Sequence, residues 1–389
     1  MESAQRIRAH IMAMPLSDAV REVLHQLAQH GAQAYVVGGA LRDWVWHPES
    51  FNASTTDWDI ATNANPALLE QLAAQHHPGE RFGTFSLAQR VEVTVMRVDG
   101  AYRDHRHPER IHPAADIMRD LRRRDFTANG AAFDGRRVVA VAHALEDLAA
   151  RRFRAVGSPQ RRFSEDPLRI LRLVRLMAVH GASVEERTWS ALQHMAAQGA
   201  LVSRERRLAE LVKFLQAPIN TWGLWNAGGL AAALEWPPGW DDSCAKRVAA
   251  PPVSAPARLS AFALISVGSL TSIHEWIRTW PLPKEWREAL ITVERQAPAI
   301  DPVRWGGLAR RPGQRYAAVF RELAAAWGIE SSQLEPLVLA LSAADLQRRW
   351  HLSGPRLGRV LRDLADTVAQ HPELNQSERL AALVDTFLA

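Results

Sequence analysis

The sequence predicts an α+β fold in which a small sheet near the N-terminus is followed by a long helical region. Short strand-like runs occur up to Val141, and one of them, VEVTVMRV, alternates apolar and other residues between two faces. From Phe163 onward the apolar residues recur at helical spacing, and no strong strand pattern follows Val184. We therefore expect a sheet-containing head followed by all-helical parts.

Length and composition limit the possible classes of protein. A chain of 389 residues is long enough for two to four domains with real cores. No apolar run approaches the roughly 18 residues of a membrane span, and the first 20 residues lack the core of a signal peptide, which favours a cytoplasmic protein. Cys244 is the only cysteine, which excludes a disulfide framework and a cysteine zinc site within one chain. The number of chains in the assembly is not readable from these features.

The basic residues are almost all arginines, and they are clustered. The net charge is only +5, yet Gly100 to Arg175 contains 17 arginines against 10 aspartates and glutamates. Arginine makes planar, bidentate contacts to phosphate and stacks on bases. This segment therefore predicts a nucleotide or nucleic-acid partner.

A glycine pair follows the first predicted strand. Tyr35–Val37 is a short β-branched and aromatic run, and Gly38-Gly39 allows a tight turn whose backbone can approach an anion. Ala40–Trp46 then reads as the start of a helix, whose free N–H groups favour phosphate. The pattern predicts a phosphate-binding turn.

Two aspartates lie one residue apart in the next predicted strand. Asp57 and Asp59 should project to one face, where two carboxylates repel each other unless a cation lies between them. Oxygen ligands of this kind suit Mg²⁺ and two-metal phosphoryl or nucleotidyl transfer. On VEVTVMRV, Glu92 shares a face with Thr94 and Met96, opposite the valines. It is either a third carboxylate of this site or an exposed strand residue.

The remaining elements of the head follow from local signals. They are a helix over 16–30 capped by Ser17 or Asp18, a helix over 66–76 opened by Pro66, strands at Phe82–Leu87 and Val91–Val98, a long loop at Asp99–His112, and a hairpin of Ala131–Asp134 with Val138–Val141. In the run RRRDFTAN, an arginine could hold a triphosphate and Asp125 could orient that arginine.

A strong helix-start signal opens SEDPLRILRLVRLMAVHG, with Ser164 as the predicted cap and Pro167 near the first turn. A polar stripe runs along this helix at three-residue spacing, formed by Asp166, Arg169, Arg172 and Arg175. Asp166 and Arg169 could form an ordinary helix ion pair. Alternatively they could read a base, because aspartate accepts from the amino group of cytosine or adenine and arginine donates to the neighbouring ring nitrogen.

Five stretches together resemble a known family. VVGGALRD, TTDWDIAT, VEVTVMRVDGAYRDHRHPE, DLRRRDFTANG and FSEDPLRILRLVR are similar, in order and spacing, to the motifs of the bacterial tRNA nucleotidyltransferase and poly(A) polymerase family, the class II group of the polymerase-β-like superfamily. The resemblance covers about residues 34–190. It differs at Gly130, where alanine is typical, at Met118-Arg119, where an acidic pair is expected, and in a longer connection from Asp43 to Asp57.

The resemblance implies a polymerase-β-like head with a small mixed sheet at 1–150, then a helical neck at 151–215, a body at 216–300 and a tail at 301–389. It implies that Asp57 and Asp59 hold Mg²⁺, with Glu92 or Asp125 as the third acid. It further implies that Gly39, Arg42 and Arg124 contact the triphosphate, and that CTP or ATP is selected by Asp166 and Arg169 with help from Arg172 and Arg175. The implied reaction is the template-independent addition of CCA to the 3′ end of tRNA, with release of pyrophosphate.

Several related activities remain as alternatives. Family members can add only CC, add only the final A, or make poly(A) tails, and a non-catalytic RNA-binding module is a more distant reading. The Asp99–Arg124 segment keeps Asp104, Arg106 and Pro108, which favours complete CCA addition, and the C-terminal residues SERLAALVDTFLA are not basic, which disfavours poly(A) synthesis. No HD motif is present, so no phosphohydrolase activity is predicted.

Overall fold

The computed structural model describes residues 2–73, 84–99, 111–114, 116–237, 239–310, 314–334 and 337–388. Its internal contacts divide the chain into two compact units, Met1–Glu210 with Gly228–Ala233 and Leu211–Ala227 with Leu234–Ala389. Within the described ranges, no helix is both long and apolar enough to cross a membrane. The expected boundaries at residues 150, 215 and 300 stay predictions.

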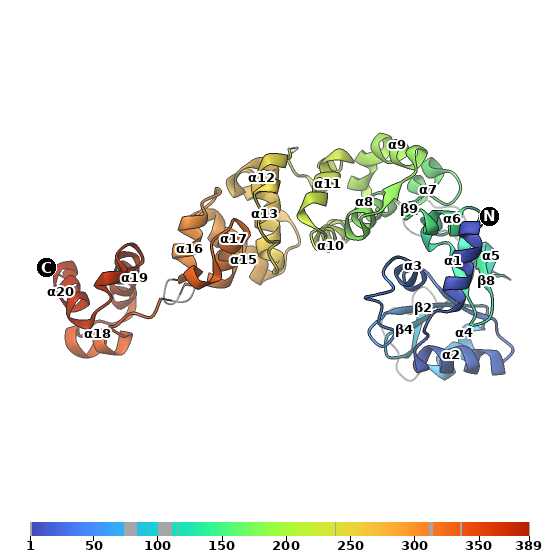
Figure 1. The fold of residues 1–389 in the computed structure, drawn as a ribbon, viewed down its shortest axis with the longest axis horizontal. Coiled ribbons are helices and arrows are strands. Elements are labelled where there is room, and N and C mark those ends of the chain that lie inside the picture. Colours follow the sequence, from blue (N-terminus) through green and yellow to red (C-terminus); the bar gives the residue numbers. More distant parts are fainter. Residues whose placement is uncertain are drawn as a thin grey trace. The chain divides into compact units, whose positions relative to one another are not determined.

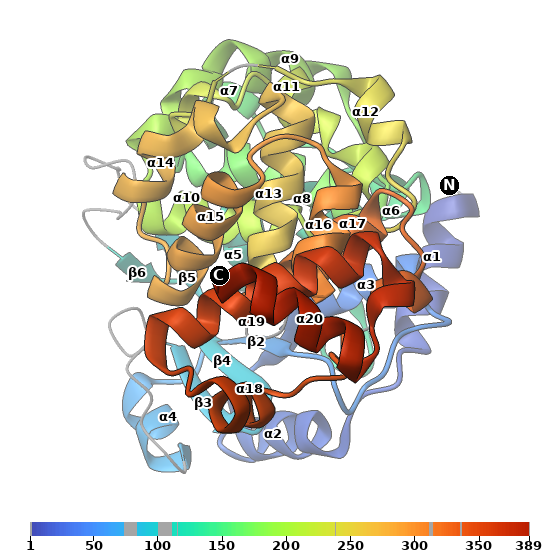
Figure 2. The same cartoon turned by 90° about the vertical axis from the view of Figure 1, so that its left-hand side faces the viewer.

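The first unit is built on a mixed six-stranded sheet with the order β3-β4-β2-β1-β7-β8 (Figures 1 and 2). The strands are β1 Ala34–Val37, β2 Trp58–Thr62, β3 Thr84–Ala88, β4 Val91–Val95, β7 Ala131–Phe133 and β8 Val138–Ala140. All neighbouring pairs are antiparallel except β2 and β4, which are parallel. This arrangement confirms the predicted small mixed sheet.

Six helices accompany this sheet, namely α1 Glu2–Met12, α2 Asp18–Gln29, α3 Gly39–Trp46, α4 Pro66–Leu72, α5 Ile117–Arg122 and α6 Ala144–Ala149. The cap predicted for α2 is confirmed, since the Ser17 side chain accepts from the Val20 N–H. Apolar side chains of β1 and α5, among them Tyr35, Val37 and Leu121, share one core cluster. The sheet therefore holds the turn after β1 on a rigid base.

The strand predicted over Val91–Val98 is interrupted. It forms β4 and then, after Met96, β5 Arg97–Asp99, which pairs with β6 Ile111–Pro113. Met96 is fully buried instead of sharing the outer face with Glu92, because its N–H donates to the Thr62 carbonyl and the chain turns into the core there. Of the predicted long loop, residues 100–110 lie outside the described residues, and its two ends are strands. Residues 82–83 and 74–76, at the ends of two other predicted elements, also lie outside them.

The helix predicted to begin at Ser164 is two helices. α7 Pro159–Glu165 is capped by Ser158, and α8 Leu168–His180 starts only after Pro167. Ser164 lies inside α7, and the side chain of Asp166 accepts from the Leu168 N–H at the start of α8. The prediction of one helix was wrong because Pro167 lacks an N–H and restricts the residue before it, which favours a break there. The unit also contains β9 Arg152–Phe153, β10 Ser183–Val184, α9 Glu186–Met195 and the start of α10 Arg204–Phe214.

The second unit is helical throughout its described residues, as predicted. Its α-helices are α11 Gly223–Ala227, α12 Asp242–Lys246, α13 Ala255–Val267, α14 His274–Thr279, α15 Lys284–Gln296, α16 Pro302–Arg310, α17 Ala317–Ala326, α18 Ala343–Trp350, α19 Gly354–Gln370 and α20 Ser377–Leu388. Six of its ten tryptophans, at positions 222, 225, 236, 276, 280 and 305, are buried in the core.

Candidate active site

The glycine turn lies directly against two predicted site residues. Gly38 has φ +78, a conformation that strongly favours glycine, and it precedes the first residue of α3. A Cβ at Gly38 would lie 3.3 Å from Arg124 Nη1 and 3.3 Å from Asp59 Oδ2. The absence of a side chain therefore lets a basic and an acidic group approach the same turn.

Asp59 and Glu92 lie opposite each other on the parallel strands β2 and β4. Both are exposed, whereas their strand neighbours Trp58 and Ile60 are buried, so the two carboxylates share the open face of the sheet. Surrounding protein atoms raise the pKa of Asp59, the Arg124 guanidinium lowers it, and the charges of Glu92 and Asp57 raise it again; the net direction is upward. This register places Glu92 beside Asp59 on an exposed face, which fits both alternatives that the sequence left open, a third carboxylate of the site or an exposed strand residue.

Asp57 lies just before β2 and points to a different partner. Its side chain is 85% exposed and forms a 2.8 Å ion pair with Arg90, which also donates to the Thr55 carbonyl. In the described part of the chain, no three His, Cys, Asp or Glu side chains lie close enough together to hold a metal ion. The donor set of Asp57, Asp59 and Glu92 still has the all-oxygen chemistry that Mg²⁺ prefers. Burial first, and the charge of Glu92 to a lesser extent, raise the pKa of Asp59, and a bound cation would oppose both effects.

Arg124 is oriented by Asp120, not by Asp125 as the sequence suggested. Arg124 Nη2 lies 3.2 Å from Asp120 Oδ2, and Asp120 also binds Arg123. Burial would raise the pKa of Asp120, but the two arginines hold it below its usual value. The prediction failed because Asp120 and Arg124 are separated by one turn at the end of α5, which brings their side chains together.

Asp125 instead lies at the centre of a buried network. It accepts from Arg172 at 2.7 and 3.0 Å and from Asn129 at 3.0 Å. Asn129 in turn accepts from Arg42 Nη1 at 2.7 Å, and Arg42 also binds Asp43. Burial would raise the pKa of Asp125, but Arg172 and the Asn129 hydrogen bond hold it well below its ordinary range. Because these partners occupy its oxygens, Asp125 suits a bracing role better than a metal-binding one.

The predicted stripe on the helix after Pro167 is made of paired side chains. Arg169 is buried and donates to Glu165 and to the carbonyls of Arg162 and Arg123. Arg175 pairs with Glu210 at 2.5 Å. Asp166 pairs with Arg206 at 3.8 Å, and the alternative of an Asp166–Arg169 ion pair is not formed. Each arginine of the stripe is therefore held by an acid outside the stripe.

Several functional neighbours were missed by the sequence analysis. Asp120, Asn129, Glu165 and Glu210 hold the predicted arginines but were not singled out. Helical spacing could have indicated Asp120 with Arg124 and Glu165 with Arg169. Glu210 is 35 residues from Arg175, so no local pattern points to it.

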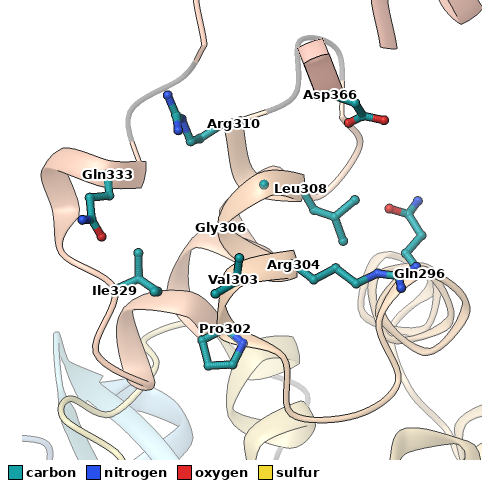
Figure 3. Close-up of a pocket in the computed structure, with 11 residues that line it drawn as sticks. Gln296, Pro302, Val303, Arg304, Gly306, Leu308, Arg310, Ile329, Gln333 and Asp366 are labelled. Carbon is teal, nitrogen blue, oxygen red and sulfur yellow. The ribbon is translucent and has the colours of Figure 1, made fainter. Parts of the chain in front are cut away.

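The second unit contains a separate hollow of about 600 Å³ beside α16 (Figure 3). Its described lining includes Arg304, Arg310 and Gln333, with Asp366 as the one acidic residue among them. Because it lacks paired carboxylates and a glycine turn, it does not reproduce the chemistry gathered around Gly38.

The sheet, the glycine turn and the facing carboxylates define the class of a polymerase-β-like nucleotidyltransferase head. Residues 34–154 match the family model described as "Poly A polymerase head domain". The CCA-adding enzyme of Lactococcus lactis subsp. cremoris MG1363 is 36% identical over 202 residues, 50% of this chain and 49% of that relative. The enzyme of L. lactis subsp. lactis IL1403 is 26% identical over 95% of this chain and 97% of its own length. Most of the curated relatives with higher identity are matched over only about half their length.

Solved structures give the same assignment. The Bacillus stearothermophilus CCA-adding enzyme in complex with CTP superposes with a TM-score of 0.68 at 25% identity, over 95% of this chain and 98% of that one. A Thermotoga maritima CCA-adding enzyme complexed with tRNA shares the fold, with a TM-score of 0.65 at 18% identity over 97% and 98% of the two chains. Residues 34–154 are thus similar to the poly(A) polymerase head domain, and nearly the full chain is similar in sequence and fold to CCA-adding enzymes.

Proposed function

We propose that this protein adds CCA to the 3′ end of tRNA from CTP and ATP without a nucleic-acid template. The observation that carries the proposal is the placement of Asp59 and Glu92 opposite each other, beside a glycine turn that also meets Arg124. This is the arrangement that a nucleotidyl transfer needs, because it combines a cation-binding edge with a phosphate-binding turn. Relatives named CCA-adding enzymes, and a similar structure in complex with CTP, support the same activity.

Asp57 and Asp59 are the residues proposed to hold Mg²⁺, and Glu92 is the third acid. The metal would supply positive charge that acidifies the terminal 3′-hydroxyl of tRNA and neutralises pyrophosphate. Asp57 is exposed, and the ion pair it forms in the described part of the chain is with a surface arginine, so it can exchange Arg90 for the metal. Glu92, which pairs with no cation among the described residues, is available to the attacking hydroxyl.

The basic groups of the site bind the triphosphate and stabilise the negative charge of the leaving pyrophosphate. Arg124 Nε is buried and has no hydrogen-bond partner in the described residues, which leaves a donor for a phosphate oxygen. Gly38 and Gly39 open the backbone for the β- and γ-phosphates, and Arg42 lies behind the turn, where Asn129 and Asp43 fix it. As the tRNA oxygen bonds to the α-phosphorus, the bond to pyrophosphate breaks, and these donors stabilise the leaving group.

Base selection is proposed for Asp166 and Arg169, with Arg172 and Arg175 holding the helix in place. Asp166 has free acceptor capacity, since its oxygens bind one backbone N–H and lie 3.8 Å from Arg206. The Arg169 guanidinium is held by hydrogen bonds to Glu165 and to two carbonyls, so the direction of its other N–H groups is fixed before a nucleotide binds. The tRNA and both nucleotides are cytoplasmic molecules, which supports the cytoplasm as the proposed compartment.

The test is incubation with tRNAs that end at the discriminator base, at C and at CC, with each labelled nucleotide in turn. We expect C, then C, then A to be added, and no further residue. Addition of only CC or only A would assign one of the partial activities, repeated A would assign poly(A) synthesis, and no addition would support a binding module. The segment with Asp104, Arg106 and Pro108 lies outside the described residues, so this assay decides among the family's activities.

A further inference from the structure

A cavity lined by several basic residues lies in the first unit, and no residue proposed for catalysis lines it. It has a volume of about 730 Å³ and is lined by residues from α5, the chain before α6, the chain after β9, α7 and α9. Its described lining contains five arginines and a histidine against one acid, Glu185. None of the proposed catalytic or nucleotide-binding residues lines it.

The arginines of this cavity divide into anchored and free groups. Arg154 is fixed by Asp147 and Glu185, and Arg162 is fixed by Glu165 and by three backbone carbonyls. The side chains of Arg122 and Arg187 are exposed and have no hydrogen bond or ion pair in the described residues. The anchored arginines thus form a basic wall, and the two unpaired guanidinium groups line the same cavity. Guanidinium groups make planar, bidentate contacts to phosphate.

The rest of the lining favours a ligand larger than a simple anion. Met118, Val141 and Val156 form an apolar wall, and His143 is exposed beside it. Gly157, with φ +77, has no atom within 4 Å of the position of a Cβ, so its backbone is open to the cavity. An apolar wall next to cationic groups suits a nucleotide unit, with its base or sugar on the wall and its phosphate on the arginines.

The arginine run after α5 links this cavity to the active site. Arg122 lines the cavity, whereas Arg124, two residues later, reaches Gly38 and Asp59. We propose that this cavity, which we call the Arg122–Arg187 pocket, binds a phosphate carried by a nucleotide unit and that its main source is the backbone of the RNA substrate. A strand held there would lie near the attack site without using any group of that site. The statement that the bound phosphate belongs to RNA rests on the proposed function, whereas the statement that the pocket binds a phosphate group does not.

The experiment measures equilibrium binding of tRNA lacking CCA to the full chain at several salt concentrations. Arg122→Gln and Arg187→Gln should each weaken binding roughly three- to tenfold and reduce the slope of log K against log salt by about 1. Arg136→Gln removes the same charge from the exposed hairpin between β7 and β8 and should leave both values unchanged. Thermal midpoints of all variants check that the head stays folded.

A second titration uses adenosine monophosphate, which offers one nucleotide and no strand. If the two pocket variants lose affinity for adenosine monophosphate but not for tRNA, the pocket binds phosphate, and its ligand is a free nucleotide. If neither affinity falls, or if Arg136→Gln falls equally, the pocket is refuted. Binding is measured without turnover, so a chain that binds tRNA through these arginines but adds no nucleotide would refute the proposed function alone. A chain that adds CCA while the pocket variants bind normally would refute the pocket alone.

Discussion

The acidic and basic sides of the candidate site differ in whether their charged side chains form ion pairs. Asp59 and Glu92 face each other across β2 and β4, and neither forms an ion pair within the described residues. The arginines on α8 are each held by a carboxylate: Arg169 by Glu165, Arg172 by Asp125 and Arg175 by Glu210. One side therefore carries uncompensated charge, and the other is neutralised before any ligand binds.

This difference separates binding chemistry from positioning. Unpaired carboxylates destabilise the free protein slightly but leave their oxygens available for a cation. Paired arginines stabilise the helix contacts, and they can take a nucleotide only with donors left over from their existing partners. Substitutions on the acidic side should therefore reduce activity without unfolding, whereas substitutions in the paired network should reduce stability.

The largest expected effect is that of Asp59→Asn. It should lower the rate of nucleotide addition roughly 10³- to 10⁴-fold, or about 4 to 5.5 kcal/mol, because the group that attracts the cation is gone. The thermal midpoint should stay unchanged or rise, since the repulsion with Glu92 also disappears. Single-turnover addition of CMP and a melting curve measure the two quantities. Asp18→Asn, at the exposed start of α2, is the control and should change neither.

Asp125→Ala should have the next largest effect, and it should appear in stability. Arg172 would be left buried without its partner, which lowers the free energy of unfolding by about 3 kcal/mol. The pKa of Asp125 is depressed in the folded state, so this stabilisation is complete above the unfolded value near 3.8 and is lost as pH falls toward the folded value. Urea unfolding measures the change. If the double variant Asp125→Leu with Arg172→Met regains the lost stability, the unpaired arginine is identified as the cause. An unchanged urea midpoint in Asp125→Ala would contradict the idea that the paired network stabilises the fold.

The parts that the sequence predicted well are those set by local chemistry. The turn at Gly38, the strand with Asp59 and the facing position of Glu92 follow from glycine's conformational freedom and from side-chain alternation, and the structure agrees with each. The helical second unit likewise follows from periodicity. Family motifs added the order of these features and hence the class of fold.

The parts that it missed depend on contacts between distant residues or on competing local effects. The Arg175–Glu210 and Arg172–Asp125 pairs join residues 35 and 47 positions apart, which no periodicity reveals. Met96 was assigned to the outer face because alternation was extended through it, whereas its hydrogen bond to Thr62 ends the strand. Pro167 was read as part of a helix start although it separates two helices. Gly130 departs from the family pattern, and a Cβ there would lie 2.6 Å from Val141 Cγ2, so the departure fits this chain's own packing.

A third way of handling a buried basic group is seen at His180, whose ring bonds to His47 at 3.1 Å and lies 3.9 Å from Asp43, and whose lowered pKa favours the neutral form. It packs against Trp46 and Phe153, and burial, together with nearby Arg42, lowers its pKa to about 3. The unfolded chain binds this proton near pH 6.5, so stability should fall as pH decreases from 6.5 toward 3. The loss should be about 2 kcal/mol between pH 6.5 and 5. Urea unfolding at these two pH values measures it, and His180→Phe should flatten this part of the profile. The exposed His30→Phe should not.

The smallest expected effect tests whether any member of the stripe reads the base. Asp166 has the longest ion pair of the four, to Arg206 at 3.8 Å. Asp166→Ala should therefore reduce the preference for CTP and ATP over UTP and GTP about tenfold, or about 1.4 kcal/mol, through loss of an acceptor for the amino group. Competition between labelled nucleotides measures the ratio, with Gln160→Ala on α7 as the control. A fall in overall rate with an unchanged ratio would place Asp166 with the arginines as a positioning residue, because a brace affects all four bases alike.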